Sequence, residues 1–194
     1  MKLFTVLLIL LIAPAEILAQ SSADGAIFER ALQVLRPLGI LREGILSKWR
    51  HLFVDGEYAR REKVLSGLTL EQVKRPPSEQ SHSIYEELWH ATRCQTIVVT
   101  RDEGWYESWQ RGEHYPIHPP VEEEEWSALV TEFLSGLEKA LEWASSPEKL
   151  GVEVDTGVTM GDVLHSLAVH NAYHMGKIVA VRQLIGAWPP AGES

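Results

Sequence analysis

The last helix-like segment of the chain contains the sequence HNAYHMGKI at residues 170–178. Its two histidines, His170 and His174, are four positions apart, and side chains with this spacing lie on one face of an α-helix. In a helical projection both fall within about 60° of Leu167, on the side that carries the other apolar residues of the segment. We therefore expect both imidazoles to point into a helical core, where they can share one divalent metal ion.

The pair alone does not specify a metal site. Eight histidines in 194 residues give this spacing by chance in about a third of such chains, and a pair without a third ligand is more often structural. The HExxH motif of zinc proteases is excluded, because Asn171 stands where that motif has Glu. His90 supplies a third candidate, since it lies in the middle of a predicted helix beside Leu88 and Trp89. Three neutral imidazoles leave one or more coordination positions open for water or substrate, as in reactive metal sites.

The other five histidines are poorer ligand candidates. Four are expected at helix ends or in loops, and the fifth is about 140° from His170 around the same helix. They are His51, His82, His114, His118 and His165.

The residues next to these histidines have two interpretations each. Cys94, one turn after His90, is either a fourth ligand or a small buried hydrophobic residue, and the second interpretation is favoured. Glu86 and Glu87 either bind the far nitrogen of His90 as outer-sphere partners or face solvent, and solvent is again favoured. Tyr173, between the two histidines of the pair, is expected to pack against its neighbours.

A long loop is predicted at residues 102–120, which contain two glycines and three prolines. Loops of this length are usually functional or mobile. Its aromatic residues Trp105, Trp109 and Tyr115 either line the mouth of the metal site or anchor the loop, and both interpretations are equally supported.

Helical periodicity accounts for most of the rest of the chain. A capping box at Ser83 and Glu86 begins a helix that extends to about Arg101, and Thr159 caps the last helix, which ends near Gly186. Further helices are predicted at residues 26–35, 41–52, 57–65 and 121–145, and no segment shows convincing strand alternation. These features indicate an all-α fold, an antiparallel helical bundle, in a domain at residues 26–190.

The N-terminus predicts a secretory signal peptide at residues 1–20. Lys2 precedes an apolar run at residues 3–13, Pro14 ends the run, and small residues follow it. The run is too short for a stable membrane span, and an uncleaved anchor is the less favoured alternative. We therefore expect an exported protein, periplasmic or secreted. Since Cys94 is the only cysteine, its stability must come from the core rather than from an internal disulfide.

The charge balance excludes one class of partner. The chain has 27 acidic and 18 basic residues, with a net charge of −9. Because nucleic-acid binding requires a basic surface, we expect no nucleic-acid partner.

Three stretches of the chain resemble the DinB/YfiT-like superfamily. HSIYEELWH at residues 82–90 is similar to the family's HSIWELLWH helix, HNAYHMGKI to its HxxxHxGQ helix, and GAWPP at residues 186–190 to its C-terminal end. The resemblance implies a four-helix bundle with one divalent metal ion, zinc, nickel or iron, held by His90, His170 and His174. The chain departs from the pattern at Lys177, where the family usually has Gln, and in its signal peptide, since most relatives are cytoplasmic.

Two functions remain open at this point. Several characterised relatives are thiol-dependent transferases or isomerases, and an open position on the metal can activate a water or a thiol. We therefore expect a metal-dependent hydrolase or thiol-type transferase that acts on an unidentified small molecule. The alternative is a non-catalytic metal-binding or stress-related module, since no general base stands out in the motifs. A third interpretation has the bundle act as a homodimer without metal.

Overall fold

The computed structural model describes residues 43–190, together with residues 30, 33, 34 and 39. The predicted signal peptide and most of the helix predicted at residues 26–35 lie outside the described residues. The chain divides into two units at Gly44, and every feature below belongs to the second unit.

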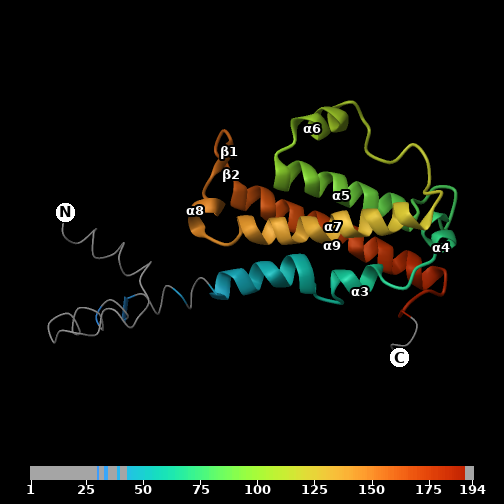
Figure 1. Ribbon diagram of the computed structural model, residues 1–194, viewed down its shortest axis with the longest axis horizontal. Coiled ribbons are helices and arrows are strands. Elements are labelled where there is room, and N and C mark those ends of the chain that lie inside the picture. Colours follow the sequence, from blue (N-terminus) through green and yellow to red (C-terminus); the bar gives the residue numbers. More distant parts are fainter. Residues whose placement is uncertain (1–29, 31–32, 35–38, 40–42, 191–194) are drawn as a thin grey trace. The chain divides into compact units, whose positions relative to one another are not determined.

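The second unit is mainly helical, as predicted (Figure 1). None of the helices in the described residues has the length and apolar character needed to cross a membrane. After helical residues 45–50, the elements are η2 (His51–Asp55, a π-helical turn), α3 (Arg61–Leu65), α4 (Leu70–Lys74), α5 (Ile84–Thr100), α6 (Glu103–Gln110), α7 (Glu123–Trp143), α8 (Pro147–Leu150), β1 (Glu153–Asp155), β2 (Val158–Thr159) and α9 (Met160–Leu184).

The predicted capping box at Ser83 and the predicted cap at Thr159 are both confirmed. The Ser83 hydroxyl accepts the backbone N–H of Glu86 at 3.2 Å, and the Thr159 hydroxyl accepts that of Asp162 at 3.3 Å. In each pair the carboxylate of the acid accepts the backbone N–H of the capping residue. These bonds satisfy N–H groups that have no partner inside the helix, so α5 and α9 begin at defined residues.

The prediction of one long loop after α5 is wrong, and a short hairpin was not predicted. Residues 102–120 are not one loop, because α6 occupies their first half; most of the glycines and prolines that predicted a loop lie after Gln110. Residues 153–159 form a two-stranded antiparallel hairpin whose turn contains Gly157 at a φ of 71°. Strands of two and three residues are too short to show the alternation from which a strand is predicted.

Helix α5 is central to the packing. It packs along both α7 and α9, and the three helices run beside one another in Figure 1. The shared core is formed by fully or almost fully buried apolar side chains from all three helices, including Leu88, Ala91, Phe133, Leu137, Leu164, Met175 and Ile178. This packing sets which side chains of α5 meet those of α9.

A buried polar chain crosses the same three helices. Gln95 of α5, which is fully buried, donates to the carbonyl of Phe133 on α7 at 2.7 Å. Its oxygen accepts from the Asn171 amide of α9 at 2.8 Å. Gly136 of α7 makes room for this side chain, because a Cβ at that position would lie 2.0 Å from Gln95 Nε2.

We expect Gly136→Ala to lower the free energy of unfolding by about 1–3 kcal/mol, the usual cost of overpacking a core. The added methyl group displaces Gln95, which cannot move without breaking its buried hydrogen bonds to Phe133 and Asn171. Gly176→Ala on α9 is the matched control, since its Cβ would meet nothing within 4 Å; this variant should gain up to about 1 kcal/mol from helix propensity. Urea unfolding followed by circular dichroism measures both, and a stabilised Gly136→Ala would contradict the prediction.

Candidate metal centre

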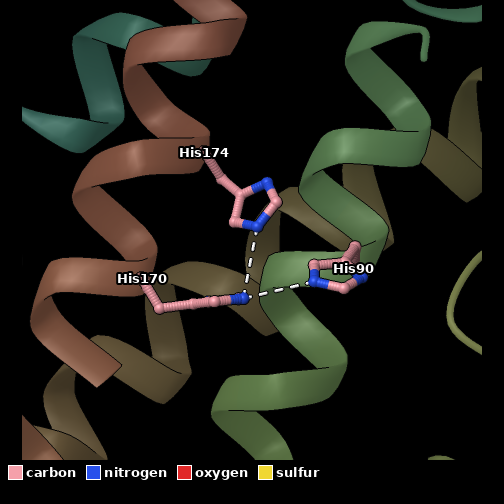
Figure 2. A group of neighbouring side chains, drawn as sticks. All are labelled: His90, His170 and His174. Atoms are coloured by element: carbon pink, nitrogen blue, oxygen red, sulfur yellow. Dashed lines mark hydrogen bonds between the residues drawn. The ribbon is translucent and has the colours of Figure 1, made fainter. Parts of the chain in front are cut away.

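The packing of α5 on α9 brings three histidines together. His90 lies on α5, and His170 and His174 lie on α9, with their rings turned toward one another (Figure 2). The Nε2 atom of His170 is 3.2 Å from Nε2 of His90 and 3.2 Å from Nε2 of His174. One nitrogen from each ring lies within 4.8 Å of the other two. His174 is buried and His170 half-buried, so the prediction that the pair faces inward is confirmed.

Hydrogen bonds to the outer ring nitrogens fix the tautomers of two of the histidines. His90 Nδ1 is 2.9 Å from the backbone oxygen of His114, and His174 Nδ1 is 2.6 Å from Glu87 Oε2. A carbonyl and a carboxylate only accept hydrogen bonds, so both Nδ1 atoms carry the proton. In the neutral rings, each Nε2 therefore presents a lone pair to the centre.

With these tautomers, hydrogen bonds within the cluster cannot satisfy all three Nε2 atoms. His170 Nε2 can carry at most one proton, yet it faces the lone pairs of two other Nε2 atoms at 3.2 Å. A metal ion satisfies all three nitrogens at once. Two nitrogens bound tetrahedrally at about 2.0–2.1 Å lie about 3.3 Å apart, so the two separations of 3.2 Å fit such an ion.

The protonation of the rings fits metal binding as well. Burial lowers the pKa of His90, and it lowers the pKa of His170 to about 4. Both rings are therefore neutral near pH 7, and neutral imidazole is the form that coordinates metals.

The comparison with known families agrees with this geometry. Residues 54–178 match the family model described as the DinB superfamily, and this range contains all three histidines. The chain belongs to the DinB superfamily. No curated protein and no solved structure matches it. The GAWPP stretch, part of the predicted resemblance, lies beyond the matched residues of this DinB-superfamily member.

Glu87 is the residue that the sequence interpretation misjudged most. An acid in the first turn of a helix was expected to face solvent, but the Glu87 side chain is fully buried between α5 and α9. Its carboxylate also accepts a hydrogen bond from His174 rather than from His90. Burial by itself would raise the pKa of Glu87, but hydrogen bonds from His174 and Lys177 hold it at about 2. Glu86 completes the capping box instead.

Two further side chains contact the same carboxylate. Lys177 Nζ forms an ion pair with Glu87 Oε1, and His82 Nδ1 is 3.2 Å from the same oxygen. Lys177 also lies over the Tyr173 ring, 5.5 Å from its centroid. Tyr173 was predicted to pack, but it is 61% exposed. The lysine that departs from the family pattern thus has a defined partner in this DinB-superfamily member.

The segment after α5 also contacts the histidine cluster, through the ring of His90. The ring centroids of Trp109 and Tyr115 lie 5.1 and 5.0 Å from that of His90. Trp109 stacks on His114 at 4.2 Å, and His114 in turn supplies the carbonyl that holds His90. Both aromatic residues therefore border the cluster, whereas the Trp105 side chain lies outside the described residues.

Two other histidines and Cys94 lie close to the cluster. His82 contacts Glu87, and the His114 carbonyl contacts His90, but neither of the two imidazoles belongs to the cluster. Cys94 Sγ is 3.8 Å from His90 Nε2, and burial raises the pKa of its thiol to about 12. Among the described residues, the group of possible ligands consists of the three histidines without Cys94. These findings favour the interpretation of Cys94 as a small, largely apolar side chain.

His170 is the least constrained of the three rings. Its Nδ1 is buried without a hydrogen-bond partner among the described residues, and so is Oδ1 of the adjacent Asn171. The Asn171 side chain is close enough to oppose the effect of burial on the pKa of His170, but the two atoms do not reach hydrogen-bond geometry. His90 and His174 are thus oriented by outer partners, and His170 is oriented mainly by its helix.

Proposed function

We propose that this protein is a DinB-type metalloprotein that binds one divalent transition-metal ion through Nε2 of His90, His170 and His174. The observation that carries the proposal is the convergence of three Nε2 atoms, two of them with their lone pairs directed inward by acceptors on Nδ1. Zinc, nickel and iron all accept imidazole ligands, so the metal has to be identified by analysis.

The proposed site leaves coordination positions open, because three ligands do not complete the shell of these ions. When bound, the ion supplies Lewis-acid chemistry toward a small molecule. Trp109 and Tyr115 border the site beside His90 and would contact such a molecule. On this basis we propose a metal-dependent hydrolase or a thiol-type transferase.

One observation favours the alternative, a non-catalytic metal-binding or stress-related module. Glu87 is the carboxylate that contacts the histidine cluster, and it is already engaged by His174, Lys177 and His82. An occupied carboxylate is a poor general base. Screening the metal-loaded protein for hydrolysis and for thiol transfer separates the two functions, and a flat result in both assays would favour the module.

The proposal extends to the architecture and location of the protein. We propose that residues 45–55 join α5, α7 and α9 in an antiparallel four-helix bundle, supported by the packing of η2 on α7 and α9. We also propose export by the N-terminal signal peptide to the periplasm or the exterior. A function without nucleic acid is supported by the net charge of −9.

We expect protein purified without chelator or affinity tag to carry close to one metal ion per chain, and His174→Ala to carry almost none. The substitution removes one of three ligands and also leaves the buried Glu87 without its partner. Elemental analysis by mass spectrometry gives both the amount and the identity of the metal. His165→Ala is the matched control, since His165 is exposed on the same helix. Metal well below one ion per chain in the native protein, or equal content in the two variants, would refute the proposal.

A further inference from the structure

Lys177 and Glu87 form an ion pair directly behind one histidine of the proposed metal centre. The two oxygens of Glu87 have different partners: Oε2 faces Nδ1 of His174, and Oε1 contacts Lys177 Nζ. Glu87 is fully buried, and the Lys177 side chain is 36% exposed. Lys177 follows His174 by three residues, so both side chains lie on the same face of α9.

This pair determines the net charge around a bound ion. Imidazoles that coordinate a metal ion are neutral, so the three histidines contribute no charge to the ligand set. Glu87 is the only carboxylate in contact with any of the three rings among the described residues, and the charge of Lys177 balances its charge. His82, the other group on this carboxylate, contacts the same oxygen as Lys177. The net charge of the occupied site therefore stays close to the charge of the ion. With a neutral side chain at position 177, the negative charge of Glu87 would be unbalanced and would lower that net charge.

We infer that Lys177 makes this metal centre selective for anionic ligands, so that its substrate or cargo binds the ion through a carboxylate or a similar small anionic group. The inference rests on the proposed metal site. A positive charge held near a partly buried ion attracts an anion at the open position and repels the ion itself. Lys177 thus acts on the two equilibria in opposite directions, strengthening the binding of the anion and weakening that of the metal. A lysine with a purely structural role would support both or neither.

The test uses the full-length protein loaded with cobalt(II), whose visible absorption reports metal binding and the arrival of an anion. Azide is the probe. We expect Lys177→Gln to raise the dissociation constant of azide about five-fold, as expected for the loss of one nearby charge at an intermediate dielectric constant. The same variant should bind cobalt more tightly. Lys177→Arg keeps the charge and should restore both values.

Lys149→Gln is the control for a general loss of charge. Lys149 is also a partly exposed lysine paired with an acid, but its ammonium group contacts Glu142 of α7 and not the histidines. Lys149→Gln should leave the affinities for cobalt and for azide unchanged. An unchanged azide affinity in Lys177→Gln, or weaker binding of cobalt and azide together, would overturn the inference. Failure of the native protein to bind cobalt would instead refute the metal site itself, and the inference with it.

Discussion

Replacing Arg182 by methionine is expected to lower the free energy of unfolding by about 3–4 kcal/mol, because a buried side chain that satisfies several carbonyl groups at once is lost. Arg182 is fully buried near the end of α9. Its guanidinium donates to the carbonyls of Val64 at 2.6 Å, Ser66 at 2.9 Å and Ala187 at 2.9–3.0 Å. Methionine fills similar space but donates no hydrogen bond, so these carbonyls lose their donor.

The same guanidinium connects two distant parts of the chain. Val64 and Ser66 are more than 115 residues away in sequence, and Ala187 precedes Trp188, whose ring lies 5.2 Å from the guanidinium carbon. Gly186, at a φ of 71°, turns the backbone after α9 so that the Ala187 carbonyl returns to Arg182. The GAWPP stretch is therefore held by Arg182, which explains its place in the fold without a role at the histidines.

Urea unfolding in the presence of a chelator measures this effect separately from any contribution of metal. Arg182→Lys retains the charge but not the branched geometry, so it should fall between the native protein and Arg182→Met. Arg111→Met is the control: Arg111 is exposed and paired with Glu113, and its loss should leave the unfolding midpoint unchanged. Equal midpoints for Arg182→Met and Arg111→Met would contradict the structural role.

Glu87→Gln is expected to weaken metal affinity about 10- to 100-fold, the usual effect of removing an outer-sphere partner from a metal-binding histidine. The buried carboxylate accepts from His174, Lys177 and His82. An amide of the same size has a single acceptor oxygen, so at least one of these groups loses its partner. His174 then loses either its fixed tautomer or its fixed orientation, and the ion also loses a nearby negative charge.

Glu86→Gln is a closely matched control, because it makes the same chemical change one residue earlier. Glu86 accepts the backbone N–H of Ser83 at 2.7 Å, and glutamine performs the same function in a capping box. A competition titration of zinc against a coloured chelator gives the affinity of each variant. If the two variants bind zinc equally, Glu87 does not orient the histidine.

Several features of the site were predictable from local pattern. The spacing of His170 and His174 places both on the inner face of α9, and a position in the middle of α5 makes His90 an inward-facing candidate. The same residues carry the resemblance to the DinB superfamily, which the match over residues 54–178 confirms. The partners of these histidines were not predictable in this way, since they come from other segments.

The boundaries of the main helices, the residues that share a helical face and the family of the chain all follow from the amino-acid sequence alone. Each depends on spacing along one stretch of chain, because capping and helical periodicity act over a few residues. Three contacts of the site arise only when the helices pack: Glu87 is buried against His174, Lys177 balances the charge of Glu87, and the His114 carbonyl holds His90. These contacts depend on how α5 meets α9 and on the path of the chain after α6. No local pattern encodes them, because they result from the close packing of elements far apart in the sequence.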